Sequence, residues 1–391
     1  MIWTTLASKP KAESQHSFIE WNIILEAARP RPDTQRLGEL LNRCPDWTRL
    51  LALAEQHSLL PLLTQRALPI SEQRVSAEFR ESLQEQQRSH TIFALRLVAE
   101  LLRVLDRLAA AGVEAVVIKG PALSTRCYGD PCLRQYSDLD LIVRTQDIGR
   151  CTEIMQKLGY EARIPGQAIR AGKIPGEYAF RQASTHLLVE FHTQHTFRYY
   201  PRRFPIERLF ERKSGVCVAG REIPALSVED ELILICIHGA KHLWERLAWV
   251  ADVAALSTGT VDWQYAFAAA QDSGAKRMLW IALHLAMDML GPPIPAEVAK
   301  CVTDDTGAIQ LAKQIARWLP HGEAENLGVF GRGLYRMRMR EAAFPGLAYL
   351  LRLTFSPTEA DWSPTTQSGR SRAWEAIGRP LRLVRKYRHE S

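Results

Sequence analysis

The stretch RQYSDLDLIV, residues 134–143, places two carboxylates, Asp138 and Asp140, in a run of apolar residues typical of a buried strand. Alternate side chains of a strand point to the same face, so both carboxylates are predicted to stand side by side on one face of a sheet. Like charges at this separation repel each other and are costly to bury unpaired. The stretch therefore predicts a bound cation, and Mg²⁺ prefers such oxygen ligands.

A third acidic residue repeats this anomaly farther along the chain. Glu190 lies in THLLVEFHT, residues 185–193, in the middle of an apolar run typical of a strand. A pair of divalent ions normally needs one more acidic ligand from a neighbouring strand, and Glu190 can supply it. An Asp-x-Asp pair alone also occurs in loops and at strand ends. The three residues Asp138, Asp140 and Glu190 together are a stronger prediction of a metal site.

The period of the apolar residues divides the chain into parts. Helical spacing covers the residues up to Gly112, which suits a helix C-cap, and it returns at Ser227, a predicted helix N-cap. Strand-like and helical patterns mix between these points. The predicted parts are a flexible N-terminus (1–18), a helical N-terminal region (19–112), an α/β core (113–226) and a helical C-terminal domain with a basic tail (227–391).

Within the core, short apolar runs predict strands and one longer periodic run predicts a helix. The predicted elements are strands at 114–120 and 139–143, an amphipathic helix within 145–160, an antiparallel strand pair at 177–183 and 185–193, and one more strand within 206–227.

Composition predicts a reduced, soluble, cytoplasmic protein. The 391 residues carry a formal net charge of +7, which suits an anionic ligand such as a nucleotide, although an ordinary basic surface explains it equally well. The seven cysteines are scattered and form no C-x-x-C pair, so neither a zinc ribbon nor a disulfide framework is indicated. No signal-peptide pattern or apolar run long enough for a membrane span is found in the sequence.

A glycine follows the strand that precedes the Asp-x-Asp segment. In VVIKGPALS, residues 116–124, Gly120 stands between that strand and a predicted short helix. Glycine lets a ligand approach the backbone closely, and a helix N-terminus favours phosphate. Taken alone, Gly120 is explained more simply by a plain strand-to-helix turn.

The segment IKGPALSTRCYGDPCLRQYSDLDLIV, residues 118–143, resembles the bacterial family of uncharacterised nucleotidyltransferases. The similarity continues in VEFH (189–192) and HGAKHLWERLAWVADVA (238–254), spans about residues 90–260, and leaves traces in DWSP and RPLRLVRKY near the C-terminus. The family belongs to the superfamily of antibiotic nucleotidyltransferases, tRNA-adding enzymes and polymerase β. The resemblance implies an α+β fold with a polymerase β-like mixed-sheet core, flanked by helical N- and C-terminal regions.

The resemblance also implies roles for individual residues. Asp138 and Asp140 would bind two Mg²⁺ or Mn²⁺ ions, and Glu190 would bind the catalytic ion and help to deprotonate the acceptor hydroxyl. Pro121 departs from the superfamily, which usually has Ser or Gly there, because proline removes a backbone donor. Arginines in the loop before the Asp-x-Asp strand would suit a triphosphate. The predicted nucleotide-binding residues are Lys119, Gly120, Ser124, Arg134, Ser137, Lys241 and His242, with Arg126 and Tyr128 in the same loop.

A stripe of polar and aromatic residues follows on a predicted helix. It comprises His238, His242, Glu245, Trp249 and Asp252. The H-x-x-x-H spacing resembles that of a zinc protease, but Gly239 stands where such an enzyme has its catalytic glutamate, so this function is rejected. Lys241 is the best candidate for a β- or γ-phosphate, and Trp244 or Trp249 for stacking on a base. Core packing is the simpler interpretation of the tryptophans, while both interpretations stay open for Lys241 and His242.

Two other patterns give weaker indications. His192 and His195 form an H-x-x-H pair, but a strand-to-loop transition points the two side chains in different directions, so no metal role is predicted. The basic segment LRLVRKYRHES at the C-terminus favours a solvated helix face over nucleic-acid binding.

The sequence predicts an enzyme that transfers a nucleoside monophosphate from an NTP, such as ATP, by in-line displacement assisted by two divalent ions. The acceptor stays open between a small molecule, a peptide or protein side chain, and a tRNA end, which a toxin-like transferase would modify. A non-catalytic nucleotide-binding protein of the same fold is the alternative, and Pro121 gives it some support.

Overall fold

A computed structural model describes residues 18–44, 46–73, 76–164, 169, 176–193 and 206–340. The predicted flexible N-terminus lies almost wholly outside the described residues, and the predicted basic tail lies entirely outside them. No helix in the described part of the chain is long and apolar enough to cross a membrane.

The N-terminal region is helical, as predicted. Its elements are α1 (Ile19–Ala28), α2 (Thr34–Asn42), α3 (Trp47–Gln56), α4 (Leu60–Ala67), the 3₁₀ turn η1 (Leu68–Gln73) and α5 (Ala77–Ala110). Helix α5 begins at an N-cap serine, Ser76, whose hydroxyl accepts from the Phe79 amide. It ends at Ala110 and is closed by Gly112, with φ of +67°, after which the Val113 amide donates to the Leu108 carbonyl. The predicted glycine C-cap is therefore confirmed.

A seven-stranded mixed sheet forms the centre of the molecule, in the order β3-β4-β5-β2-β1-β7-β6. The strands are β1 (Ala115–Ile118), β2 (Asp138–Val143), β3 (Tyr160–Ala162), β4 (Glu177–Gln182), β5 (Leu188–His192), β6 (Ser214–Val218) and β7 (Arg221–Ala225). The predicted antiparallel pair is present as β4 and β5. The mixed sheet confirms the predicted α+β class.

One prediction about the sheet was wrong. The segment 206–227 was expected to hold a single strand, and it holds the hairpin of β6 and β7 after a short helix, α9 (Ile206–Glu211). Ala219 and Gly220 make the turn, both with positive φ. An Ala-Gly pair is a weaker hairpin signal than Asn-Gly or Asp-Gly, so the second strand was not recognised.

The two faces of the sheet belong to different hydrophobic cores. Leu139, Leu141 and Val143 of β2 pack in the core that includes α5 and α7 (Ile148–Lys157). Ile142 of β2 and Ile118 of β1 point to the opposite face and join the core of the remaining helices. Asp138 and Asp140 share the side of Ile142, since residues two apart in a strand face the same way. The predicted site therefore faces the helical part of the molecule.

The helices after the sheet complete that second core. They are α10 (Val228–Lys241), α11 (Leu247–Leu256), α12 (Trp263–Ser273), α13 (Lys276–Leu290), α14 (Ala296–Val302), α15 (Thr306–Trp318) and α16 (Val329–Arg338). Ser227 caps α10 by accepting from the Asp230 amide, which confirms the predicted N-cap.

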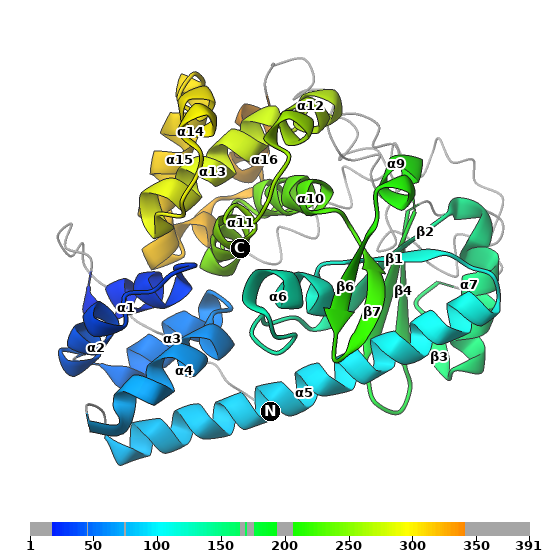
Figure 1. The fold of residues 1–391 in the computed structure, drawn as a ribbon, viewed down its shortest axis with the longest axis horizontal. Coiled ribbons are helices and arrows are strands. Elements are labelled where there is room, and N and C mark those ends of the chain that lie inside the picture. Colours follow the sequence, from blue (N-terminus) through cyan, green and yellow to red (C-terminus); the bar gives the residue numbers. More distant parts are fainter. Residues whose placement is uncertain are drawn as a thin grey trace.

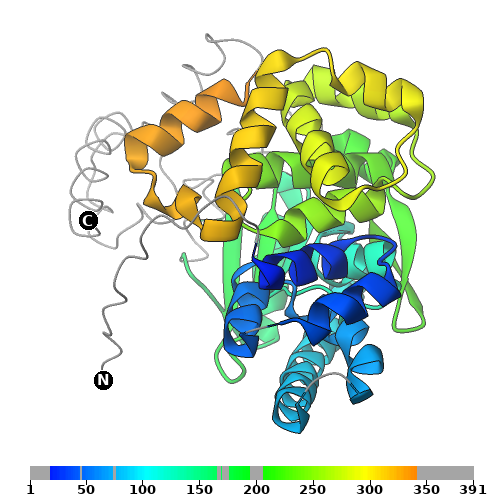
Figure 2. The same cartoon turned by 90° about the vertical axis from the view of Figure 1, so that its left-hand side faces the viewer.

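The N-terminal helices α1 to α4 pack directly on these C-terminal helices. Trp21 and Ile24 of α1 share one core with Leu279 and Leu283 of α13. Figure 2 shows the N-terminal helices lying against the C-terminal ones, and Figure 1 shows α5 running from the N-terminal helices to the sheet. Residues 19–83 and the C-terminal helices thus share one hydrophobic core, while the predicted boundaries at 112 and 226 stay predictions.

Candidate metal and nucleotide site

The strand register brings the acidic residues together. Strands β2 and β5 are parallel, and their pairing sets Asp140 opposite Glu190, and Ile142 opposite His192. Asp138 is the first residue of β2, two positions before Asp140, and lies opposite Leu188. Alternation therefore places both aspartates, Glu190 and His192 on one face of two neighbouring strands.

Three of these side chains lie close enough to hold one metal ion. The Nε2 atom of His192 lies 2.7 Å from Oδ1 of Asp140 and 3.9 Å from Oε2 of Glu190. One ligand atom from each of the three residues lies within 4.8 Å of the other two. Two carboxylates and an imidazole are ordinary ligands of divalent cations. This donor set fits the metal that the sequence predicts.

A fourth acidic residue, Glu177, joins the site from the next strand. It is the first residue of β4 and lies opposite His192 of β5. Its carboxyl group shares a hydrogen bond with that of Glu190. The sequence analysis missed this residue, because an acidic side chain at the start of a strand looks like an ordinary solvated strand end.

The carboxylates perturb one another strongly. Burial, followed by repulsion from Glu177 and Asp140, raises the pKa of Glu190 to about 9. Burial and the charge of Asp140 likewise raise the pKa of Asp138. The site therefore holds more negative charge than its own cations neutralise, which is the situation that a divalent ion relieves.

Positive neighbours keep the other two carboxylates ionised. Burial acts to raise the pKa of Asp140, but the Lys119 ammonium and His192 outweigh it and hold that pKa well below its usual range. Burial also acts to raise the pKa of Glu177, and the charges of His192 and Lys241 lower it. Lys241 is thus near enough to act on the acidic group from the end of α10.

Lys119 stands at the turn between β1 and helix α6 (Gly120–Tyr128) in an unusual backbone conformation. Its φ is +57° and its ψ is −147°, a region rarely adopted by residues other than glycine and costing about 1–3 kcal/mol. Its Nζ lies 3.4 Å from Oδ2 of Asp140. Backbone strain of this kind concentrates at functional sites, where surrounding contacts enforce it. The turn therefore holds an ammonium group against the carboxylates.

Gly120 and Pro121 start α6 beside the first residue of β2. Gly120 has a φ of +50°, and a Cβ there would lie 3.8 Å from the carbonyl oxygen of Asp138. Pro121 stands in the first turn of the helix, where the amide has no intrahelical partner to lose. The missing donor at Pro121 therefore does not disturb the helix itself.

Other residues predicted to bind the nucleotide are engaged in buried contacts. Ser124 is fully buried, donates to the Asp130 carbonyl and accepts from the Arg134 amide. Arg134 is 8% exposed and forms an ion pair with Asp252 of α11, with 2.9 Å between Nε and Oδ2. Tyr128 donates to the other oxygen of Asp252 at 2.9 Å. These contacts do not support the nucleotide-binding role predicted for Ser124 and Arg134.

Arg126 belongs to the same buried scaffold. Its guanidinium pairs with Glu231 of α10 and donates to the Ser214 hydroxyl and the Leu226 carbonyl, at 2.8 and 2.7 Å. The scaffold fixes α6, and with it the turn at Lys119, to the C-terminal helices. Ser137, in contrast, is exposed immediately before Asp138, so its predicted contact with the nucleotide stays open.

The end of α10 brings three more predicted residues towards the site. Lys241 is exposed, while the ring of His242 lies 4.7 Å from that of His238. Burial, followed by the charge of Lys241, lowers the pKa of His242 to about 3. Burial and then Lys119 hold the pKa of His238 far below its usual value. Both histidines are therefore neutral, and Lys241 is the cation that this helix offers to a phosphate.

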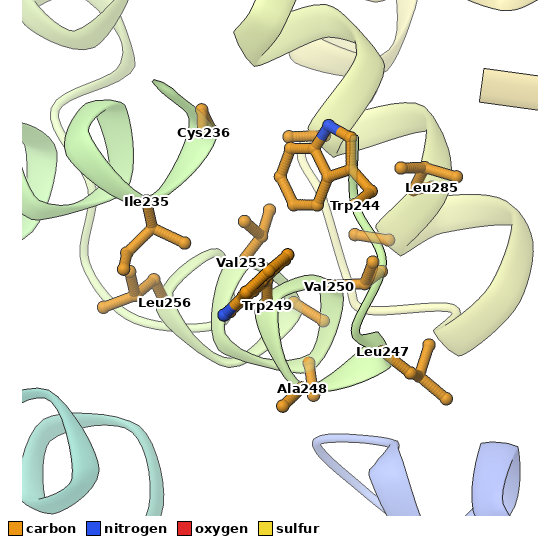
Figure 3. Close-up of a cluster of buried hydrophobic side chains, with 14 of the residues drawn as sticks. Ile235, Cys236, Trp244, Leu247, Ala248, Trp249, Val250, Val253, Leu256 and Leu285 are labelled. Atoms are coloured by element: carbon orange, nitrogen blue, oxygen red, sulfur yellow. The ribbon is translucent and has the colours of Figure 1, made fainter. Parts of the chain in front are cut away.

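The two tryptophans of this motif are packing residues. Trp244 is fully buried and Trp249 is 7% exposed, and Figure 3 shows both rings among apolar side chains that include Val250 and Val253. A Cβ at Gly239 would lie 2.6 Å from the Trp244 ring, so the tryptophan requires a glycine there. The core-packing interpretation is confirmed for Trp244, whose ring is closed to a base. His195, the second histidine of the H-x-x-H pattern, lies outside the described residues.

Comparison with known proteins gives a family match and a distant similarity to solved structures. A crystal structure of an antigenic nucleotidyltransferase-like protein from Paracoccidioides brasiliensis is similar over 54% of this chain and 94% of that chain, with 13% identity and a TM-score of 0.34, a likeness too distant to support a conclusion. No curated protein matches the chain significantly. The family described as "Uncharacterised nucleotidyltransferase" matches residues 43–291, well over half of the chain. The protein therefore belongs to this nucleotidyltransferase family.

Proposed function

We propose that the protein is a metal-dependent enzyme that transfers a nucleoside monophosphate from an NTP to an acceptor hydroxyl or phosphate. The observation that carries the proposal is the register of β2 and β5, which sets Asp140 against Glu190 with Asp138 on the same face. The family supports transfer of a nucleotidyl group. The unneutralised charge of the carboxylates supports a bound cation.

The acidic residues would hold the metal, and the basic residues would hold the phosphates. Asp138, Asp140 and Glu190 are the proposed ligands, and a bound divalent ion would supply charge neutralisation at the reacting phosphate. Lys119 and Lys241 would contribute ammonium groups, one from the turn after β1 and one from the end of α10. Arginine contacts are not part of the proposal, since Arg126 and Arg134 are engaged in ion pairs.

The reaction would be an in-line displacement. An oxygen of the acceptor attacks the α-phosphorus, the bond from the α-phosphorus to the bridging oxygen breaks, and pyrophosphate leaves. The acceptor proton would pass to a carboxylate of the site, for which Glu190 is the candidate. Positioning and charge stabilisation supply most of the catalysis in such a reaction.

The proposed reaction is tested by measuring whether the α-phosphate of an NTP is transferred to an acceptor. The purified protein is incubated with each α-labelled NTP in turn, with Mg²⁺ or Mn²⁺ and a cell extract, and a parallel reaction uses γ-labelled NTP. We expect α-label in an acceptor, γ-label only in pyrophosphate, and loss of both when EDTA removes the metal. Nuclease and protease treatment of the labelled product then separates tRNA, protein and small-molecule acceptors. NTP binding without any label transfer would favour the non-catalytic alternative.

A further inference from the structure

We infer that His192 is a direct ligand of a metal ion held with Asp140 and Glu190, and that this nitrogen ligand makes the ion Mn²⁺ in preference to Mg²⁺. The inference rests on the proposed function for the presence of a metal, and it adds a nitrogen ligand that the carboxylate pattern does not contain.

The first support is geometric. Ligand atoms that lie about 2.1 Å from one ion can be at most about 4.2 Å apart. The Nε2 atom of His192 meets this limit with both partners, at 2.7 Å from Asp140 Oδ1 and 3.9 Å from Glu190 Oε2. Asp138 is not a member of this three-residue group in the described part of the chain. The imidazole is therefore close enough to both carboxylates to bind the same ion as they do.

The second support is the way in which β5 holds the imidazole. His192 is 7% exposed and is the last residue of β5, flanked by β2 on one side and by Glu177 of β4 on the other. A ring fixed between two paired strands loses little freedom when it binds an ion, which favours a preformed site. The Asp140 carboxylate is also 6% exposed, so both ligands are already removed from bulk water.

The third support is the cation already present beside Asp140. The Lys119 ammonium lies 3.4 Å from Oδ2 of that residue, whereas His192 faces Oδ1. The two oxygens of Asp140 are thus divided between an ammonium and the side that carries Glu190 and His192. An ion on the Oδ1 side would have two oxygen ligands and one nitrogen ligand from the protein.

A nitrogen ligand changes which ion binds best. Mg²⁺ prefers oxygen ligands and retains much of its water, whereas first-row divalent metals bind mixed nitrogen and oxygen sites with an affinity that rises from Mn²⁺ towards Cu²⁺. The site should therefore bind Mn²⁺ more tightly than a site of three carboxylates would, relative to Mg²⁺. The competing interpretation is that His192 only orients Asp140 through a hydrogen bond and never contacts the ion.

Electron spin echo spectroscopy of bound Mn²⁺ separates the two interpretations without any assay of transfer. Wild-type protein loaded with Mn²⁺ alone, and with Mn²⁺ plus a non-hydrolysable NTP, is expected to show nitrogen coupling from one directly bound imidazole. The coupling should change to the ¹⁵N pattern after ¹⁵N-histidine labelling. Bound Mn²⁺ without this coupling would overturn the inference.

His192→Gln identifies the residue, and His284→Gln is the matched control. His284 has the same 7% exposure and donates from Nε2 to the Val302 carbonyl, at 3.1 Å, in the helical part of the chain. In His192→Gln the nitrogen coupling should vanish and the ratio of Mn²⁺ to Mg²⁺ affinity should fall at least about 10-fold, since even outer partners of metal-bound histidines contribute that much. His284→Gln should retain both properties.

The outcomes separate the inference from the proposed function. Imidazole-bound Mn²⁺ in a protein that transfers no α-label would support the inference and overturn the function. Label transfer with Mn²⁺ bound only by oxygen would do the reverse. If His192→Gln does not fold, the ¹⁵N-labelled wild type still gives the answer, and failure to bind Mn²⁺ even with the NTP analogue would overturn both.

Discussion

Two groups of buried charges in this protein differ in how they are neutralised. In the sheet, Asp138, Asp140, Glu177 and Glu190 lie together, and among the described residues Lys119 and His192 form ion pairs with this group. Between α6 and the helices α10 and α11, by contrast, each buried arginine is paired with one carboxylate, as Arg126 with Glu231 and Arg134 with Asp252. Ion pairs with equal and opposite charges hold parts of the structure together. An excess of buried negative charge, in contrast, favours the binding of a cation.

The largest predicted effect comes from removing the excess charge. The double substitution Asp138→Asn and Asp140→Asn should lower α-label transfer by at least about 10³-fold, because loss of the metal removes several kcal/mol of barrier reduction. The protein should still fold, since asparagine has the shape of aspartate and the loss of like-charge repulsion at Asp138 offsets part of the lost contacts of Asp140 with Lys119 and His192. The rate of label transfer and the urea midpoint are measured together.

Asp106→Asn serves as the control, because Asp106 is an exposed carboxylate of α5 paired with Arg221. It should leave both the transfer rate and the urea midpoint unchanged. Wild-type transfer by the double variant would remove the two aspartates from the proposed site.

The next effect comes from breaking a matched pair. Asp252→Ala should lower the free energy of unfolding by about 3–5 kcal/mol, because it leaves the buried Arg134 guanidinium without a counter-charge. It also deprives the Tyr128 hydroxyl of its acceptor. Urea unfolding followed by circular dichroism measures the change. A loss below about 1 kcal/mol would show that this pair behaves like a solvated one.

The smallest effect tests the cation offered by α10. Lys241→Ala should weaken NTP binding by about 10-fold, as expected for the loss of one charged hydrogen bond worth roughly 1.5 kcal/mol. Stability and Mn²⁺ affinity should not change, because the side chain is exposed. Lys300→Ala, which removes an exposed lysine of α14, is the control in the same titration. Unchanged NTP affinity in Lys241→Ala would leave this lysine without a binding role.

The sequence was informative where local pattern and chemistry agree. Alternation of apolar residues placed Asp138, Asp140 and Glu190 on strands, and the structure pairs those strands. Cap residues such as Ser227 were also readable, because capping depends on the neighbouring residues alone.

The remainder of the site depends on contacts between distant segments. His192 meets Asp140 across 52 positions, and its local pairing with His195 gave no sign of that contact. Glu177 reaches Glu190 only through the register of β4 and β5. The ion pair of Arg134 with Asp252 spans 118 positions, so the arginine appeared free for a phosphate. The sequence pattern shows which charged side chains lie in otherwise apolar segments. The fold determines which of them have a partner of opposite charge.

The most direct test of the unmatched charge is the thermal stability of Glu190→Gln. Below the unfolded-state pKa of about 4.5, wild-type Glu190 is neutral in both states, and no difference is expected. As the pH rises towards 9, the unfolded wild type releases a proton that the folded state retains, so the wild type loses stability and the variant does not.

Thermal unfolding of both proteins is therefore followed at pH 5 and pH 8, without metal and with Mn²⁺. In metal-free buffer at pH 8, Glu190→Gln should unfold at a higher temperature than the wild type, with a smaller difference at pH 5. Mn²⁺ should raise the midpoint of the wild type and leave that of the variant nearly unchanged. A variant that is less stable than the wild type without metal, or equally stabilised by Mn²⁺, would contradict the account.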